Sequence, residues 1–402
     1  MVLSTATAAV AADDPAVRLD RFGAPLPERG DRGAAVKPGP VARALAAEGS
    51  GHFQPLETIP TGSWPQNVAI GDVTGDGRND VLLSTTYYFD EENDYKLFVY
   101  AQRADGTLEP GVKYDTLLTY SSQAGIAVLD ATGDGRSDVA LTTENGVQLL
   151  AQSAGGTLVD QGLLAGSPRA QSVVATDVDA DGDTDLLTAG GSGVTALAQG
   201  PAGVFTAAPV TTEPAGTVRV GDLNGDGRLD AATYAGTGAT VHLNLAGGWR
   251  SQAPVTTAES INSIEVADVT GEGRADLVVT AGGNRPSSIV EVFAQTRRGT
   301  LGAGVTYPVV DIPEPVRAAD ITGDGRLDLV VAHGGWNTLS TLKQNASRTL
   351  AAPVTDTLPY ASHYSNDGLA VGDITSDGRP DVVIADYNHG LVIARNAHRT
   401  RS

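Results

Sequence analysis

The stretch GDVTGDGRND at residues 71–80 carries three aspartates and a threonine at regular spacing. Asp72, Thr74 and Asp76 stand at alternating positions, which are positions 1, 3 and 5 of a loop, and Asp80 follows at position 9. Ca²⁺ takes about six to eight oxygen ligands in a flexible shell. Gly77, at position 6, allows the sharp turn that brings such side chains together. The spacing therefore favours a calcium loop over an active site or a simple acidic turn.

The same pattern occurs seven times, with first aspartates 45 to 58 residues apart. The other copies are LDATGDGRSD (129–138), TDVDADGDTD (176–185), GDLNGDGRLD (221–230), ADVTGEGRAD (267–276), ADITGDGRLD (319–328) and GDITSDGRPD (372–381). At positions 1, 3, 5 and 9 they place Asp130, Thr132, Asp134 and Asp138; Asp177, Asp179, Asp181 and Asp185; Asp222, Asn224, Asp226 and Asp230; Asp268, Thr270, Glu272 and Asp276; Asp320, Thr322, Asp324 and Asp328; and Asp373, Thr375, Asp377 and Asp381. An EF-hand is excluded, because position 12 holds an aliphatic residue or threonine where that motif needs glutamate.

Simple Asp/Gly turns are the alternative to metal sites. Positions 1, 3, 5 and 9 of these loops hold 22 of the 48 acidic residues, and without these 22 the net charge of −21 would be +1. Clustered carboxylates repel one another unless a cation is bound. We therefore predict up to seven structural Ca²⁺ ions. The loop of Asp177 is the most acidic and should bind most tightly, whereas the long side chain of Glu272 makes its loop the least suitable.

The residues around each copy predict strands. A short alternating strand precedes each loop, and an apolar run such as DVLLS or DLVVA follows it. A third apolar segment and a fourth strand complete a unit of about 50 residues. We predict an all-β fold, a seven-bladed β-propeller of four-stranded antiparallel blades. The last repeat lacks its fourth strand, and the segment 49–59 has the missing pattern, so this N-terminal strand should close the ring.

The seven D-x-[TDN]-x-[DE]-G-x-x-D loops and their flanking strands resemble the FG-GAP/VCBS family of repeat propellers over about residues 50–402. The resemblance implies a calcium-binding seven-bladed propeller that works outside the cell. Family members include lectin-like and adhesion modules, and the head of the integrin α-subunit has a similar plan. The repeat type indicates fold and metal, but it does not identify the ligand.

Outside the repeats, residues 1–12 are small and apolar and end in an Ala-x-Ala pattern. We interpret them as the remnant of a signal peptide, with a disordered Ala-rich tail as the alternative. Residues 13–49 are predicted to be a flexible leader or linker, and 50–402 the propeller. The chain has no cysteine, and no apolar run long enough to span a membrane. Its acidic charge disfavours nucleic acid as a partner.

The face opposite the acidic loops is predicted to carry the rarer side chains, mainly on the sixth, seventh and first blades. The candidate ligand-binding residues are Tyr87, Tyr88, Trp336, Tyr364, Tyr387 and His389. Trp64, Tyr120, His333, Tyr360 and His363 are expected nearby. Exposed aromatic side chains suit sugar stacking or protein recognition. The alternative is that several of them pack between blades or cap the central channel.

On three neighbouring inner strands, Arg219, Glu265 and Arg317 occupy matching positions. A buried ion-pair chain and a channel-lining anion site both remain open from sequence alone.

We predict a secreted, calcium-stabilised binding or adhesion module that acts as a monomer and recognises a carbohydrate or a cell-surface protein. No nucleophile motif, catalytic triad spacing or phosphate loop is visible, so no catalytic residue is assigned. The alternatives are a secreted polysaccharide-active enzyme, such as a lyase or dehydratase, and a passive scaffold.

Overall fold

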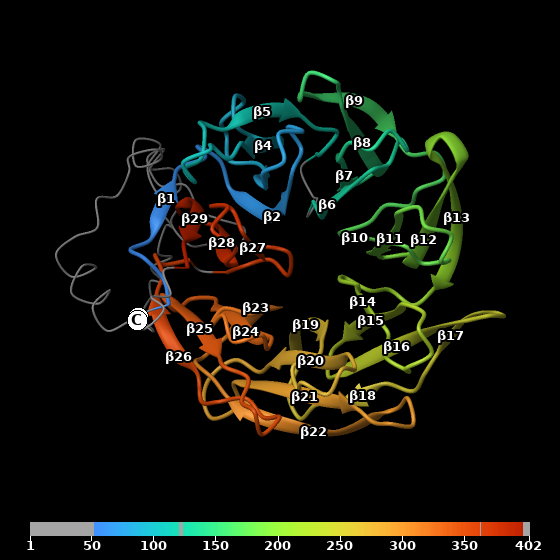
Figure 1. Ribbon diagram of the computed structural model, residues 1–402, viewed down its shortest axis with the longest axis vertical. Coiled ribbons are helices and arrows are strands. Elements are labelled where there is room, and N and C mark those ends of the chain that lie inside the picture. The colour runs from blue at the N-terminus through green and yellow to red at the C-terminus, as the bar shows by residue number, and fades with distance from the viewer. Residues whose placement is uncertain (1–51, 120–123, 362, 397–402) are drawn as a thin grey trace, which may run out of the picture.

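The computed structural model describes residues 52–119, 124–361 and 363–396, which form seven antiparallel sheets around a common centre (Figure 1). The described part of the chain is almost purely β, with one short 3-10 turn, η2 (Pro201–Gly203). It contains no helix that could cross a membrane. The predicted all-β, seven-bladed propeller is therefore confirmed. The segments 1–12 and 13–49 and Tyr120 lie outside the described residues.

Each sheet is one blade, and in blades one to six the strands follow chain order from the centre of the ring to the outside, whereas in blade seven the outermost strand is β1. Blade one consists of β2 (Pro65–Gly71), β3 (Asp80–Thr85), β4 (Lys96–Tyr100) and β5 (Val112–Asp115), blade two of β6 (Ile126–Leu129), β7 (Asp138–Thr143), β8 (Gly146–Gln152) and β9 (Leu158–Leu163), and blade three of β10 (Ser172–Thr176), β11 (Asp185–Gly190), β12 (Gly193–Gly200) and β13 (Val204–Thr211). Blade four consists of β14 (Arg219–Gly221), β15 (Asp230–Ala235), β16 (Gly238–Leu245) and β17 (Gly248–Ser251), and blade five of β19 (Ile261–Ala267), β20 (Asp276–Ala281), β21 (Ile289–Gln295) and β22 (Leu301–Pro308). Blade six consists of β23 (Pro313–Ala319), β24 (Asp328–His333), β25 (Thr338–Leu342) and β26 (Val354–Thr357), and blade seven of β27 (Leu369–Gly372), β28 (Asp381–Asp386) and β29 (Gly390–Ala394), completed by β1 (Glu57–Ile59).

Blade four differs from the predicted four-strand pattern. A short additional strand, β18 (Val255–Thr256), pairs with the start of β16, while β17 pairs with its end. The outer edge of this blade is therefore shared by two short strands.

The ring is closed as predicted, by a strand from the start of the chain. β1 pairs with β29 in the register Glu57–Ile393, Thr58–Val392 and Ile59–Leu391. The backbone N–H of Gln54 donates to the carbonyl of Arg395 at 2.8 Å and extends this pairing. Closure covers the outer edge of blade seven, which would otherwise expose unpaired backbone groups.

The core lies between blades rather than within one central mass. The second strand of most blades is buried on both faces, which explains why runs such as DVLLST and DVVIAD do not alternate. The buried apolar side chains of the described residues form seven clusters, and each cluster joins two neighbouring blades. Burying one such Val or Leu side chain contributes about 1.5–3 kcal/mol. Every blade is thus stabilised by both of its neighbours.

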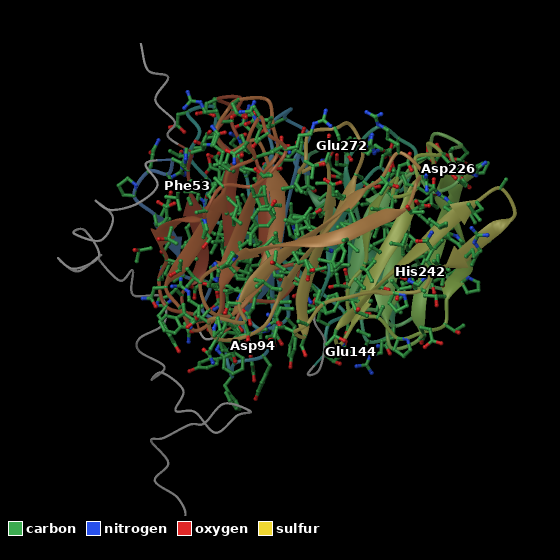
Figure 2. All side chains as sticks on the ribbon, turned by 90° about the horizontal axis from the view of Figure 1, so that it is seen from below. Phe53, Asp94, Glu144, Asp226, His242 and Glu272 are labelled. Atoms are coloured by element: carbon green, nitrogen blue, oxygen red, sulfur yellow. The ribbon has the colours of Figure 1, made fainter. Side chains whose placement is uncertain are left out.

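The two faces of the ring carry different connections. The loops between first and second strands lie on one face, called here the loop face, which carries Asp226 and Glu272 in Figure 2. The hairpins between second and third strands lie on the opposite face, called here the hairpin face, where Figure 2 shows Asp94 and Glu144. This separation agrees with the sequence expectation.

Candidate metal loops and ligand-binding face

The acidic loops, numbered 1 to 7 in chain order, wind around the aspartate at position 1. In loop 1, Asp72 Oδ1 accepts the N–H groups of Gly75 at 2.7 Å and Asp76 at 3.2 Å, and its Oδ2 accepts that of Gly77 at 2.8 Å. The other six loops repeat bonds of this pattern. The carboxylate at position 1 therefore holds the sharp turn that the glycine permits, which is the local geometry a calcium loop needs.

The aspartate at position 9 has a second role that the sequence pattern did not reveal. Asp80 is fully buried, and its Oδ2 accepts the N–H groups of Val73 and Thr74, both at 3.0 Å. Its Oδ1 accepts the N–H of Gln102, at the end of the third strand, at 3.0 Å. The carboxylate thus fastens the loop to the blade, in addition to its predicted role as a ligand.

All seven aspartates at position 9 are fully buried: Asp80, Asp138, Asp185, Asp230, Asp276, Asp328 and Asp381. Burial raises their pKa values, to about 6 for Asp230 and Asp276. A nearby cation would offset this cost of burying a carboxylate.

The hydroxyl at position 3 supports a hard cation as the missing partner. The Oγ1 atoms of four residues at position 3 are buried beside the carboxylate at position 9 but form no well-aligned hydrogen bond: Thr74, Thr132, Thr270 and Thr322. In loop 7, Thr375 Oγ1 donates to Asp381 Oδ2 at 3.2 Å. A buried hydroxyl without a partner is costly. Because these oxygens belong to the predicted ligand sets, the donor atoms present fit Ca²⁺.

Arginine at position 7 changes the charge balance that the sequence suggested. In five loops it forms an ion pair with the acidic side chain at position 5: Arg78–Asp76, Arg136–Asp134, Arg274–Glu272, Arg326–Asp324 and Arg379–Asp377. Loops 5 and 6 gain a second cation from Arg348 and Lys343. Repulsion between the carboxylates is therefore weaker in these loops than the acidic count alone indicated.

Loop 3 is the exception, because Asp183 occupies the position that arginine holds elsewhere. Ligand oxygens of Asp177, Asp179 and Asp185 lie within 4.8 Å of one another. Burial and the neighbouring carboxylates of Asp181 and Asp177 raise the pKa of Asp179. Loop 3 thus combines the most negative charge with carboxylates that form no ion pair within the described part of the chain.

Amide side chains link five loops, numbers 1, 3, 4, 5 and 6, to the following blade. Gln295 Nε2 of blade five donates to the carbonyl of Asp222 in loop 4 at 2.7 Å, and Gln344 of blade six donates to that of Asp268 in loop 5 at 3.2 Å. Asn244 and Asn396 make equivalent bonds to loops 3 and 6. This contact had a signal in the sequence, since a Gln or Asn stands within two residues of the end of the third strand in every blade.

On the hairpin face, six aromatic rings from blades seven and one form a connected group, called here the aromatic cluster. The ring centroids of Trp64 and Tyr387 are 4.6 Å apart and stacked, and those of Trp64 and Tyr88 are 4.8 Å apart. Tyr88, Phe89, Tyr87 and Tyr95 continue the group at centroid distances of 4.5–6.4 Å. Three predicted ligand-binding residues, Tyr87, Tyr88 and Tyr387, are therefore brought together.

The expectation that the candidate aromatic side chains are exposed is wrong at two positions. Tyr88 is only 1% exposed, because it packs against Trp64, and Tyr364 is 2% exposed within the apolar cluster between blades six and seven. Trp336 is 45% exposed, as expected, and so is Tyr360 at 50%. Their loops are joined by a 2.7 Å hydrogen bond from Gly335 N to Ala361 O.

The two histidines of the hairpin ends have different environments. His389 is partly exposed, and its Nδ1 lies 3.0 Å from Oδ1 of the fully buried Asp386. This carboxylate raises the pKa of His389 and fixes the orientation of its ring. His333 was expected on the surface, but it is fully buried between Ser340 Oγ at 2.8 Å and the carbonyl of Asp311 at 3.1 Å.

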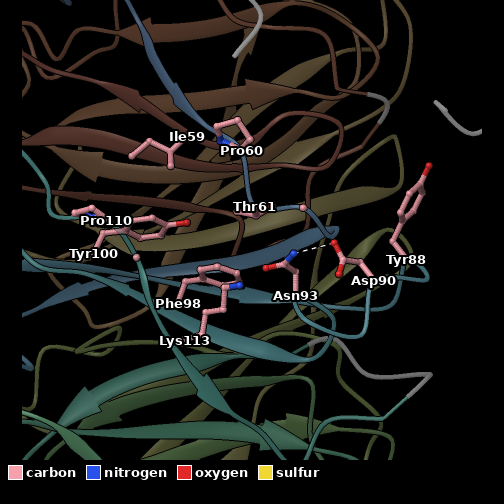
Figure 3. A pocket seen from close by; sticks show the side chains of 12 residues that line it. Ile59, Pro60, Thr61, Tyr88, Asp90, Asn93, Phe98, Tyr100, Pro110 and Lys113 are labelled. Carbon is pink, nitrogen blue, oxygen red and sulfur yellow. Dashed lines mark hydrogen bonds between the residues drawn. The ribbon is translucent and has the colours of Figure 1, made fainter. Parts of the chain in front are cut away.

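A pocket of about 470 Å³ lies beside the aromatic cluster, between β1 and blade one (Figure 3). Phe98 and Tyr100, stacked with centroids 6.1 Å apart, form an apolar wall, and Asp90, Asn93 and Lys113 supply polar groups. This size and mixture are typical of small-molecule sites. Of its lining, the sequence predicted only Tyr88 as a ligand-binding residue. The rest was missed, because it comes from neighbouring hairpin residues, from strands interpreted only as structural elements and from the closing N-terminal segment.

In the central channel, Arg219, Glu265 and Arg317 lie close together as their matching positions predicted. A fourth member, Asp367, was missed. Its Oδ1 lies 2.6 Å from Arg219 Nη2 and 3.1 Å from Arg317 Nη2. The ion-pair interpretation is confirmed, and an anion would have to compete with this carboxylate for both guanidinium groups.

Solved structures with low sequence identity share the fold. An Agrocybe aegerita lectin, described as recognising non-reducing terminal N-acetylglucosamine, is 18% identical with a TM-score of 0.52, and the match covers 82% of this chain and 94% of that chain. Hydrazine synthase of Kuenenia stuttgartiensis is 12% identical, with a TM-score of 0.53 and coverage of 83% and 96%. BBS1N, solved in complex with ARL6DN, is 13% identical, with a TM-score of 0.53 and coverage of 85% and 94%. Since these proteins differ in activity, the shared fold does not separate binding proteins from enzymes.

No curated protein matches the chain in sequence. The model of the FG-GAP-like repeat matches four times, at residues 130–188, 177–233, 222–279 and 320–384. Together these matches span more than half of the chain, and they coincide with the acidic loops and the strands that flank them. The chain therefore belongs to the FG-GAP-like repeat family.

Proposed function

We propose that the chain is an extracellular, calcium-stabilised module that binds carbohydrate on the hairpin face of blades six, seven and one. The observation that carries this proposal is the aromatic cluster with its adjoining pocket (Figure 3). Aromatic faces stack on the C–H faces of sugars, while carboxylate, amide and ammonium groups bind hydroxyls. The pocket is lined by one side chain of each of these three kinds, Asp90, Asn93 and Lys113, which can bind sugar hydroxyls. The fold likeness to a lectin that recognises N-acetylglucosamine favours the same class of ligand.

The bound Ca²⁺ would have a structural role. The side chains at positions 1, 3 and 5 would hold it, with the carboxylates at position 9 at the base of each loop. The ion would supply positive charge that neutralises these groups. The amide links from loops 1, 3, 4, 5 and 6 would extend its effect to the neighbouring blades.

The extracellular location rests on the family resemblance and on the proposed signal remnant at residues 1–12, followed by the leader at 13–49. N-terminal sequencing of the mature protein, secreted by the organism that naturally produces it, would test this location. Recovery of residues 1–12 on the mature protein would contradict the assignment.

Glycan-array binding of the calcium-loaded chain tests the ligand class. We expect specific binding that falls by about tenfold or more in Trp336→Ala and Tyr387→Ala, a typical loss for an aromatic contact residue. Trp249→Ala, on β17 of blade four, is the matched control and should bind normally.

The outcomes separate the alternatives. Unchanged binding by both hairpin-face variants would refute this location. Binding to a cell-surface protein, but to no glycan, would overturn the ligand class. Release of sugar products from a polysaccharide would identify an enzyme. Absence of binding to any glycan or protein would favour the alternative of a passive scaffold.

A further inference from the structure

The central channel has one charged half and one apolar half. The third residue before the first aspartate of each loop lines it at one level: Ala69, Ala127, Val174, Arg219, Glu265, Arg317 and Ala370. The small apolar residues come from blades seven, one, two and three, and the charged ones from blades four, five and six. Together with neighbouring residues of the inner strands, they enclose a cavity of about 410 Å³.

The two arginines are held in the same way by one short segment of the chain. Arg219 Nη1 donates to the carbonyl of Val218, and its Nη2 donates to Asn366 O at 3.2 Å and Asp367 Oδ1 at 2.6 Å. Arg317 makes the equivalent bonds, to Val316 O at 2.7 Å, Asn366 O at 2.9 Å and Asp367 Oδ1 at 3.1 Å. Both side chains are therefore fixed before any ligand arrives.

The segment that carries Asp367 reaches across the hairpin end of the channel. Asn366 Nδ2 donates to Tyr234 OH of blade four at 2.8 Å. Ser365 Oγ donates to the carbonyl of Gln66 in blade one at 2.9 Å. Residues 365–367 thus contact blades on opposite sides of the ring, so a ligand would enter from the loop face.

Part of the hydrogen-bonding capacity of the charged groups is unused. Each guanidinium has five N–H donors, and its three hydrogen bonds to protein groups use only some of them. Glu265 Oε2 lies 3.9 Å from Arg219 Nε and 3.7 Å from Arg317 Nη1, which is too far for direct hydrogen bonds. A hydroxyl group between them could accept from an arginine and donate to the glutamate.

The charges limit the class of ligand. Two arginines and two carboxylates sum to zero, so neither an anion nor a cation is favoured. The wall opposite is formed by Ala69, Ala127 and Val174, which can contact C–H groups only. We propose that the channel is a second binding site, separate from the hairpin face, for a small neutral polyol of about monosaccharide size.

Isothermal titration of the calcium-loaded full chain with myo-inositol tests this site. We expect saturable one-to-one binding with a Kd below about 10 mM. Glu265→Gln, which keeps the shape but loses the charged acceptor, should weaken it about tenfold to hundredfold. Val174→Phe, which fills the apolar half, should abolish it. Thermal unfolding of each variant shows whether it is folded.

Trp336→Ala and Tyr387→Ala are the matched controls, because they alter only the hairpin face, and they should bind myo-inositol normally. Loss of binding in these controls would place the polyol on the hairpin face and overturn the channel site. Absence of saturable binding, with only water between Arg219 and Glu265 in a crystal soaked with myo-inositol, would also overturn it. Neither result would affect the proposed glycan binding on the hairpin face.

Discussion

At the scale of single residues, His333 shows that a side chain chosen for its chemistry can have a structural role. Its position at the end of β24 suggested a surface ligand. The structure buries it, and burial lowers its pKa from 6.5 to about 4. The sequence could not reveal this, because His333 bonds to Ser340 Oγ across its own hairpin and to the carbonyl of Asp311 in the preceding connector, and neither contact follows from the repeat pattern.

The pKa of His333 predicts a loss of stability in acid. The unfolded chain takes up a proton below about pH 6.5, whereas the folded chain resists it until about pH 4. The contribution of neutral His333 is therefore complete above pH 6.5 and falls by up to about 3 kcal/mol as the pH drops to 4. Urea unfolding of the wild type and His333→Gln between pH 7.5 and 4 measures it.

The difference in unfolding free energy between the two proteins should shrink as the pH falls, because glutamine does not titrate. The buried aspartates titrate in both proteins and cancel in this comparison. A difference that stays constant over the whole range would contradict the assignment.

The unequal loops predict unequal calcium affinities. Asp179→Asn removes one charge from loop 3, which has no arginine at position 7, and should weaken the tightest calcium binding by about tenfold or more. Asp324→Asn in loop 6 is the matched control, because Arg326 and Lys343 already pair with that carboxylate. Its effect on calcium affinity, measured by calorimetric titration, should be smaller.

Equal losses in the two variants would show that local cations do not set the order of affinity. The sequence identified loop 3 by its acidic count, but the ion pairs that distinguish the other loops became clear only from the structure.

At the scale of elements, strand order was predictable because one pattern repeats seven times. Each copy carries its own turn glycine and apolar runs, so a strand that is ambiguous in one repeat can be assigned by comparison with the other repeats. β18 was not predictable, because Val255 and Thr256 have no counterpart in the other repeats. Asp367 was missed for a similar reason, since it lies in a connector outside the repeated pattern.

The closing strand predicts a sharp boundary for truncation. Removing residues 1–60 deletes β1 and exposes the edge of β29, so we expect aggregation or loss of the folded monomer. Removing residues 1–49 leaves β1 in place and is the matched control. Size-exclusion chromatography and circular dichroism distinguish them. A folded, monomeric 61–402 fragment would contradict the role of β1 in closure.

At the scale of the whole molecule, the proposed calcium ions would act on a core that is distributed around a ring. Five loops, numbers 1, 3, 4, 5 and 6, contact the next blade through an amide, so loss of the ions should loosen these blade junctions. We predict that chelation with EGTA lowers the midpoint of thermal unfolding. Each site saturated at 100 times its Kd would add about 2.7 kcal/mol.

Restoring calcium should restore the midpoint, and magnesium at the same concentration should not, because Mg²⁺ demands a tighter octahedral shell. A midpoint unaffected by EGTA would refute the structural role of calcium.

The pairing of Glu57 with Ile393 also means that the ring cannot close until nearly the whole chain has been synthesised. At about 5–20 residues per second, the ribosome needs tens of seconds to make the chain between these partners. During this time the strand that will complete the last blade has no blade to join. The nascent protein therefore carries an unpaired β-strand until synthesis is almost complete, and this interval is when a chaperone, or a neighbouring chain on the same messenger RNA, could bind it.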